Sequence, residues 1–309
     1  MEKNLKNMRK QLKDTGTFYT PIKLANKMKS YIDFKPKMVY DPTAGQGNLL
    51  SVFDDDVEKY GQEIDADELE KAKANLVNFY GYAGDTLKDD YFKDMKFDCI
   101  FSNPPYSIKW EQNDKDERFK QAGTIPPAGK ADFAFLLHII HHLSEDGVAV
   151  VLNSPGVCYR GQREGKIRQW FVEQNYIERI VHVPENSGFS DTKIATCIWI
   201  LRKNKTTTDI VFEDMEKKKE KIVSFDEVKS QNFNLSVSTY IEDDTPKKIA
   251  DPIDLRKKAR QQSIQNLMYG LKVDAICCEL DGNMMDHLQL INEVKKALLE
   301  YEMEFLGTK

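Results

Sequence analysis

The stretch Asn103-Pro104-Pro105-Tyr106 follows an apolar run, residues 97–100, that is typical of a buried strand. Prolines have no N–H group and a fixed φ, so this turn is stiff. We expect the side-chain oxygen of Asn103 and the carbonyl of Pro104 to point outward as two acceptors. Two converging acceptors suit an –NH₂ group, which has two hydrogens to donate. Tyr106 offers a flat face, so the motif predicts a site for a planar, amine-bearing substrate.

Such a site favours attack by the amine on a methyl donor. Hydrogen bonds from both amine hydrogens make the nitrogen more tetrahedral, and its lone pair becomes less conjugated. The gain comes mainly from positioning and from preorganised polar groups. The plainer reading of the motif is a rigid Pro-Pro turn with a capping asparagine.

A glycine-containing loop, "DPTAGQGNLL" at residues 41–50, follows the first predicted strand. Gly45 and Gly47 permit a tight turn and close approach of a ligand, although such loops are often tight turns only. The third glycine of the dinucleotide fingerprint is missing, because Leu50 occupies its place. Asp41 at the strand end would repel a pyrophosphate and attract an ammonium group. The loop therefore predicts a ligand without phosphate.

Two more acids end the next predicted strands. Glu63 suits the two hydroxyls of a ribose. Asp85, within "AGDTL", can accept from an adenine amine. Each acid taken alone reads equally well as a surface or helix-capping residue. Together they predict a ligand with an amine, a ribose and an adenine, which is S-adenosylmethionine.

The elements that must position these residues alternate between strand and helix from residue 17 to 202. This pattern predicts an α/β fold with a Rossmann-like, mostly parallel sheet of about seven strands and helices on both faces. Ligands of such sheets bind beyond the carboxyl ends of the strands. The predicted strands are 38–41, 60–65, 79–85, 97–103, 147–153, 177–183 and 194–201. The predicted helices are 21–33, 66–78, 131–145 and 163–175.

The alternation ends after residue 203. A polar linker follows, and the charge run at 215–221 reads as solvated surface. Residues 246–309 look helical, with apolar positions three and four apart, so this tail either folds back or docks on a partner. We divide the chain into a basic tail or short helix, a catalytic domain, an extension packed on that domain and a helical tail that is a possible partner interface: 1–14, 15–203, 204–245 and 246–309.

Composition narrows the class of protein. The 309 residues carry a net charge of −5, which argues against strong DNA affinity by the chain alone. No run reaches the roughly 18 apolar residues of a membrane span. The basic N-terminus has no apolar segment behind it, so it is not a secretory signal. The five cysteines include no Cys-x-x-Cys pair, which fits a reduced, cytoplasmic protein.

Several blocks resemble a known family. "NPPY" after a strand, with "DPTAGQG" upstream, resembles the amino-methyltransferases that act on adenine N6 in DNA. "TGTFYTP" at 15–21 precedes the loop, an order similar to the gamma class. The resemblance implies that the following residues contact S-adenosylmethionine: Phe18, Tyr19, Thr20, Pro21, Asp41, Ala44, Gly45, Gly47, Glu63, Asp85 and Asn103.

Within that class, residues 15–242 resemble the modification subunit of type I restriction–modification systems, which are bacterial or carried by phages and mobile elements. The resemblance implies that Tyr106 and Phe189 stack on an adenine extruded from duplex DNA. It also implies a separate specificity subunit that binds near the C-terminal helices; a homo-oligomer is the alternative. The chain departs from the family in lacking the helical domain that usually precedes the "FYTP" block.

Other readings stay open. The same amine chemistry applies to cytosine N4, RNA adenine or a protein glutamine, and a non-catalytic, cofactor-binding assembly subunit is a further alternative. His138 and His142 have the spacing of a zinc pair, but Ile139 stands where a glutamate is usual. With no third ligand evident, we interpret them as half-buried histidines and expect no metal. The adjacent Cys277 and Cys278 are expected to pack in a core or interface.

Overall fold

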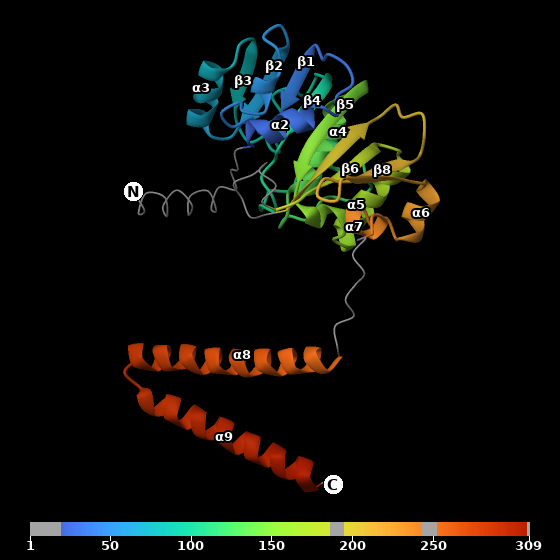
Figure 1. Ribbon diagram of the computed structural model, residues 1–309. Helices are drawn as coiled ribbons and strands as arrows, with labels where there is room; N and C mark the ends of the chain where they lie inside the picture. Colours follow the sequence, from blue (N-terminus) through green and yellow to red (C-terminus); the bar gives the residue numbers. More distant parts are fainter. Residues whose placement is uncertain (1–19, 186–194, 243–251, 308–309) are drawn as a thin grey trace. The chain divides into compact units, whose positions relative to one another are not determined.

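The computed structural model describes residues 20–185, 195–242 and 252–307, and it forms two compact units, Met1–Asp243 and Asp244–Lys309. Each unit is described by itself. Figure 1 shows the first unit as a sheet with helices and the second as a pair of helices. Among the described residues, no helix combines the length and the apolar character of a membrane span.

The first unit is built on a nine-stranded sheet in the order β3-β2-β1-β4-β5-β7-β6-β8-β9. Strands β1 to β5 pair in parallel, whereas β7 runs antiparallel to both β5 and β6. This arrangement confirms the predicted mostly parallel α/β fold. The strands are β1 Met38–Asp41, β2 Glu58–Glu63, β3 Phe79–Ala83, β4 Phe97–Ser102, β5 Leu143–Asn153, β6 Ile177–Val183, β7 Thr196–Arg202, β8 Ile210–Asp214 and β9 Lys219–Val223.

The sheet has two strands more than the seven expected. β8 pairs in parallel with β6, and β9 closes an antiparallel hairpin with β8. This hairpin was not predicted, because the charge run at 215–221 supplies its turn and the first residues of β9. The middle of β9 is exposed and only Val223 is buried, so an edge strand reads like solvated surface in the sequence.

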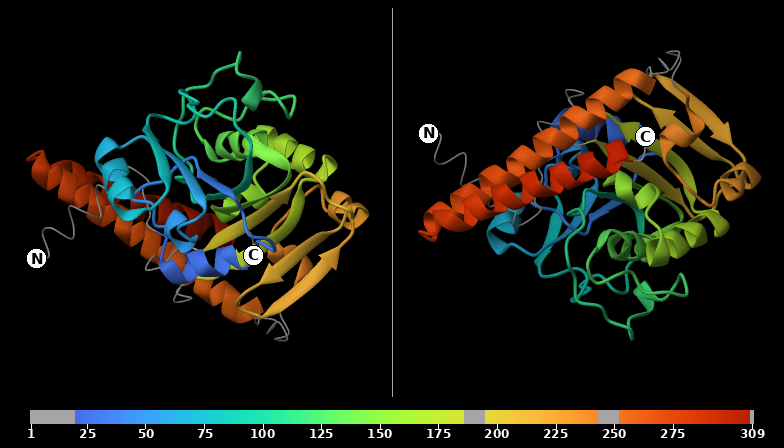
Figure 2. Two further views of the ribbon diagram at one scale, coloured as in Figure 1. Left: turned by 90° about the horizontal axis from the view of Figure 1, so that it is seen from above. Right: turned by 90° about the horizontal axis from the view of Figure 1, so that it is seen from below.

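Helices cover both faces of the sheet, and the period of two along each strand divides the core. Val39 and Phe101 pack in one core with α2, while Tyr40 and Ile100 pack in the other with α4 and α5. The two views in Figure 2 show α2 and α5 on opposite sides of the strands. The helices of this unit are α2 Ile22–Lys29, α3 Ala66–Asn75, α4 Asp132–His142, α5 Gln162–Glu173, α6 Phe225–Ser230 and α7 Val237–Tyr240.

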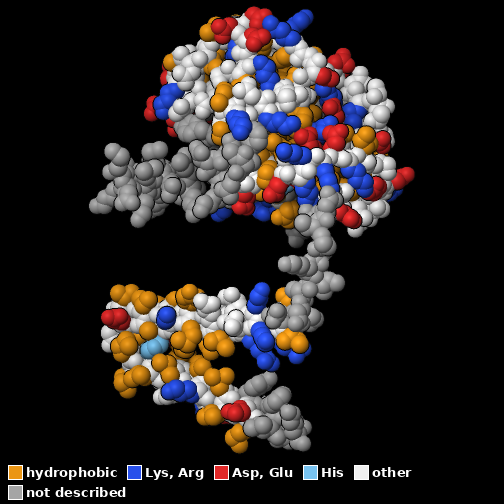
Figure 3. All heavy atoms as spheres, viewed as in Figure 1, with side chains coloured by type: hydrophobic (Ala, Val, Ile, Leu, Met, Phe, Trp, Pro, Cys, Tyr) orange, Lys and Arg blue, Asp and Glu red, His pale blue; other side chains and the backbone are white. Residues whose placement is uncertain are grey.

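The second unit is a helical hairpin of α8 (Pro252–Leu280) and α9 (Met284–Gly307). Gly282 adopts a φ of +72° in the turn between them. Figure 3 shows hydrophobic side chains over much of the visible surface of both helices. The exposed large hydrophobic residues include Leu267, Tyr269, Ile276, Leu280, Leu288, Leu298 and Leu299. The hairpin therefore leaves an apolar surface uncovered within its own unit.

Candidate active site

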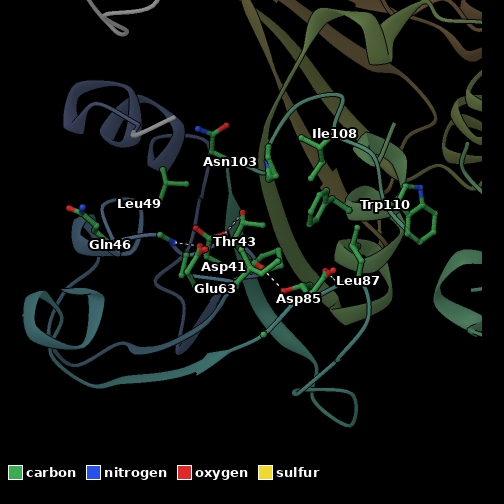
Figure 4. A pocket seen from close by; sticks show the side chains of 18 of the residues that line it. Asp41, Thr43, Gln46, Leu49, Glu63, Asp85, Leu87, Asn103, Ile108 and Trp110 are labelled. Carbon is green, nitrogen blue, oxygen red and sulfur yellow. Dashed lines mark hydrogen bonds between the residues drawn. The ribbon is translucent and has the colours of Figure 1, made fainter. Parts of the chain in front are cut away.

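A pocket opens beyond the carboxyl ends of β1, β2 and β4, at the point where strand order reverses between β1 and β4 (Figure 4). Residues predicted from the sequence line much of it. Those that do are Thr20, Asp41, Ala44, Gly45, Glu63, Asp85, Asn103 and Pro105. This is the position at which open α/β sheets bind ligands.

Asp41 lies buried at the end of β1. Its Oδ1 accepts hydrogen bonds from the backbone N–H of Thr43 at 3.0 Å, from the Thr43 hydroxyl at 3.3 Å and from Ser102 Oγ at 2.8 Å. Burial raises the pKa of Asp41 to about 7, because the charged carboxylate loses water. Asp41 therefore ties the first loop to the end of β4, where the Asn-Pro-Pro-Tyr motif begins.

Glu63 fastens the same loop to β2. Its Oε2 accepts the N–H of Gly45 at 2.8 Å and its Oε1 accepts the N–H of Asp65 at 3.0 Å. Gly45 and Gly47 have φ values of +52° and +81°, a region that glycine occupies without a Cβ clash. Gly47 does not line the pocket; a Cβ there would stand 2.5 Å from Leu76 Cδ1. Its role in the structure is close packing against the end of α3.

Asp85 follows β3, and its Oδ1 accepts the N–H of Leu87 at 3.0 Å. The neighbouring Thr86 donates from Oγ1 to the carbonyl of Pro42 at 2.6 Å. The structure thus brings the third acid to the same edge of the sheet as Asp41 and Glu63. The strands that precede the three acids are neighbours in the sheet, in the order β3-β2-β1.

The apolar side of the pocket was not predicted from the sequence. Ile64 is 71% exposed although it follows Glu63 directly. The other apolar lining residues come from distant segments: Leu49, Leu87, Ile108, Trp110 and Phe135. In the sequence, the one indication of this surface is the apolar Ile64 next to Glu63. Residues 107–130 give none, because their apolar residues follow no regular period. These side chains form a surface against which a flat ring can pack.

Of the Asn-Pro-Pro-Tyr motif, Asn103 and Pro105 line the pocket, whereas Pro104 and Tyr106 do not. Asn103 Nδ2 donates to Thr20 Oγ1 at 3.0 Å, and the Tyr106 hydroxyl donates to Asn103 Oδ1 at 2.7 Å. Pro104 is buried and Pro105 lines the pocket, whereas Tyr106 is half-buried against the core. Burial raises the pKa of Tyr106 well above its usual value, so its hydroxyl stays protonated as a donor. The bond between Asn103 and Tyr106 was not foreseen.

Three predicted site residues, Phe18, Tyr19 and Phe189, lie outside the described residues. Pro21 lies at the start of α2, and its carbonyl accepts the N–H of Ala25 at 3.0 Å. It is not among the residues that line the pocket.

His138 and His142 differ from the half-buried histidines that the sequence predicted. Both are fully buried rather than half-buried, because α4 is covered on nearly every side. Asp90, which the sequence did not reveal, completes a group of three side chains whose ligand atoms could hold a metal ion; its Oδ2 lies 3.0 Å from His142 Nε2. Arg118 lies 3.4 Å from Asp90 and 2.9 Å from His138 Nδ1, so the carboxylate already faces a cation. Sequence spacing showed the histidines but not Asp90, which comes from a loop before β4.

Arg118 links this buried cluster to the pocket. Its guanidinium donates to the carbonyls of Thr86 at 2.8 Å and Leu87 at 3.3 Å. Asp116 accepts from the same guanidinium at 2.7 Å. The segment after the motif is thereby anchored behind the loop that carries Asp85.

The chain has the Rossmann-like fold of S-adenosylmethionine-dependent methyltransferases. The chain belongs to the N-6 DNA Methylase family, whose model matches residues 2–277. It is 30% identical over 334 residues to the type I restriction enzyme MpnII methylase subunit of Mycoplasma pneumoniae, covering 85% of this chain and 61% of that protein. The HindI methylase subunit of Haemophilus influenzae is 30% identical over 62% of this chain and 47% of its own length.

Solved structures agree with this assignment. The type I restriction-modification system methyltransferase subunit from Streptococcus thermophilus superposes with a TM-score of 0.67 at 29% identity, covering 73% of this chain and 59% of that one. The EcoKI M protein has the same fold, with a TM-score of 0.53 at 17% identity. The resemblance to type I modification subunits is thus confirmed. The chain spans about 60% or less of the length of these relatives.

Proposed function

We propose that the protein transfers a methyl group from S-adenosylmethionine to the N6 amine of adenine in DNA. The observation that carries this proposal is the position of Asn103, which lines the same pocket as Asp41, Glu63 and Asp85. An acceptor amide thus stands beside a set of acids suited to an adenosine-containing donor. The relatives named as type I methylase subunits support the same substrate class.

The described residues fit the donor. Glu63 would accept from the ribose hydroxyls, and Asp85 from the adenine amine, with the ring against Ile64 and Leu87. Asp41 and Thr20 lie toward the motif, where the ammonium-bearing part would extend. When bound, the cofactor supplies an electrophilic methyl group.

Asn103 and the carbonyl of Pro104 would accept the two hydrogens of the target amine, which orients its lone pair toward that methyl. Because adenine N6 is paired and stacked in duplex DNA, the base must leave the helix. Its extrusion costs about a few kcal/mol of free energy. Tyr106, with Phe189, would offset part of this through stacking. The protein's contribution is chiefly positioning in a preorganised polar site.

Recognition of a DNA sequence is proposed to come from a specificity subunit that binds the α8–α9 hairpin. Exposed apolar residues on a helical surface mark interaction sites. In the hairpin, Leu280 is 81% exposed and Leu299 61%. A net charge of −5 also favours a partner that contributes most of the DNA contacts.

The decisive experiment incubates the purified chain and S-adenosylmethionine with unmethylated DNA, followed by digestion and mass spectrometry. N6-methyladenine in the wild-type sample and none with Asn103→Ala supports the proposal. N4-methylcytosine, or product only with RNA or a protein glutamine, overturns the substrate assignment. If the free chain binds the cofactor without transfer, the assay is repeated with the specificity subunit. Absence of product in that complex refutes the proposed activity.

A further inference from the structure

We infer that Asp132 is a positioning residue that holds the Asn-Pro-Pro-Tyr motif in its acceptor geometry by clamping Ser107, the residue directly after Tyr106. The inference deepens the proposed function and rests on it. Asp132 itself touches neither the pocket nor the motif's acceptor groups. Its action would pass through the backbone of Ser107 and the ion pair with Arg160.

Ser107 needs such a clamp because of its backbone conformation. Its φ is +53°, in the left-handed region that non-glycine residues seldom occupy. The N–H of Ser107 donates to Asp132 Oδ2 at 3.2 Å. One residue on, the carbonyl of Ile108 accepts the N–H of Ala131 at 2.9 Å. Two hydrogen bonds therefore fasten the chain after the motif to the start of α4.

The left-handed turn also directs the following chain into the pocket. Ile108, Lys109 and Trp110 line it immediately after Ser107. A different φ at Ser107 would therefore displace both the end of the motif and this wall. Such conformations persist where the surrounding structure determines them, and they concentrate at active sites.

Asp132 is itself held from two other segments. Its Oδ1 accepts from Ser154 Oγ at 3.1 Å, just after β5. Its Oδ2 lies 3.2 Å from Arg160 Nη2, and that guanidinium also binds both oxygens of Glu164, at 2.8 and 2.7 Å. The carboxylate is buried, with 1% of its side chain exposed.

Gly156 makes room for this arrangement. A Cβ at Gly156 would stand 2.3 Å from Arg160 Nη1. An alanine at Gly156 would therefore force the guanidinium to shift from its place beside Asp132. This offers a way to disturb the clamp without touching the carboxylate.

The simpler role for an acid in the first turn of α4 is to stabilise the helix N-terminus. Its hydrogen-bond partners favour the clamp instead, because they lie on Ser107, Ser154 and Arg160. No side-chain hydrogen bond caps α4 at Ala131. The carboxylate is therefore turned toward the motif rather than toward its own helix.

The test compares Asp132→Asn with Asp98→Asn in the full chain. Asp98 accepts the N–H groups of Lys37 at 2.7 Å and Met38 at 2.9 Å, at the opposite end of β4 from the motif. We expect Asp132→Asn to lower kcat about 10- to 100-fold, as for a misplaced catalytic group. We expect Asp98→Asn to reduce thermal stability but to leave kcat unchanged.

Rescue separates positioning from general stabilisation. Glycine adopts the left-handed conformation without penalty, so Asp132→Asn with Ser107→Gly should regain about fivefold or more in kcat. Hydrogen exchange over residues 107–110 should quicken in Asp132→Asn and stay unchanged in Asp98→Asn. If Asp132→Asn does not fold, Gly156→Ala should give the same changes in weaker form.

Four results would overturn the inference: an unchanged kcat in Asp132→Asn, equal losses in both Asn variants, no rescue by glycine, or unchanged hydrogen exchange over residues 107–110. The exchange measurement needs no methyl transfer, so it tests the clamp even if the proposed activity fails.

Discussion

The Tyr106 hydroxyl donates a 2.7 Å hydrogen bond to Oδ1 of Asn103, so the two ends of the Asn-Pro-Pro-Tyr motif bind each other. From the other side, Asn103 Nδ2 donates to Thr20 Oγ1 at 3.0 Å. A hydroxyl donor at the oxygen and an acceptor at the nitrogen fix the orientation of the amide. Because an amide oxygen has two lone pairs, Asn103 Oδ1 has the capacity for a second hydrogen bond besides that from Tyr106.

Replacing Asn103 by alanine should lower kcat for methyl transfer at least about 100-fold, by analogy with the loss of one preorganised polar group. The affinity for S-adenosylmethionine should change little, since Asp41, Glu63 and Asp85 remain. The measurements are initial rates and calorimetric titration with the cofactor. Asn204→Ala is the matched control, because within the described residues that amide donates to Asp146 on the surface, at 3.0 Å. Transfer that survives in Asn103→Ala would exclude the amine-acceptor mechanism.

Replacing Tyr106 by phenylalanine keeps the ring and removes the bond to Asn103. If this hydrogen bond contributes a net free energy of about 1 kcal/mol, its loss should lower kcat roughly fivefold. The loss should not vary with pH in the assay range, because burial raises the pKa of Tyr106. Tyr106→Ala should lower kcat further, because it also removes the ring that stacks on the base. A faster phenylalanine variant would mean that the hydroxyl competes with the substrate for Asn103.

The parts of the fold that the sequence predicted are those governed by local patterns. Buried strands that end in polar residues located Asp41, Glu63 and Asn103, and parallel pairing then brings such ends to one edge. Residues 108–110 could not be placed, because their path depends on the left-handed Ser107 and its contact with Asp132, which lies 25 residues away.

The buried cluster beside the pocket escaped prediction for a similar reason. His138 and His142 are related by helical spacing, but Asp90 meets them only through the packing of a loop against α4. Strand β9 was missed because an edge strand exposes charged residues and loses the apolar alternation that marks inner strands.

Replacing Glu63 by glutamine should weaken binding of S-adenosylhomocysteine about tenfold or more, because hydrogen bonds to a charged group contribute about 1.5–3 kcal/mol. Glu63→Gln should also reduce the preference for the ribose form over a 3′-deoxy analogue. Calorimetric titration of both ligands measures this. The control is Glu70→Gln, which alters an exposed acid paired with Lys73 on α3. A larger loss for the ribose form than for the 3′-deoxy analogue would support the ribose contact, whereas equal losses for both ligands would contradict it.

The raised pKa of Asp41 predicts an unusual dependence of stability on pH. Burial raises the pKa in the folded protein to about 7, against 3.8 in the unfolded chain. Between these values the folded state binds more protons, so the contribution of Asp41 to stability falls as pH rises from about 4 to 7. Urea unfolding at pH 5 and pH 8 should show a larger fall for wild type than for Asp41→Asn. Parallel pH profiles of the two proteins would show that Asp41 titrates normally.

Gly45 and Gly47 form a matched pair for testing the loop. Both have positive φ, so alanine at either should destabilise the fold by about 1–2 kcal/mol. At Gly45 a Cβ meets nothing within 4 Å, whereas at Gly47 it would overlap Leu76 Cδ1 at 2.5 Å. Gly47→Ala should therefore lose about 1–3 kcal/mol more than Gly45→Ala. Urea denaturation measures the difference. The second change Leu76→Ala should relieve the overlap in Gly47→Ala and leave the loss in Gly45→Ala unrelieved, because only Gly47 abuts the end of α3.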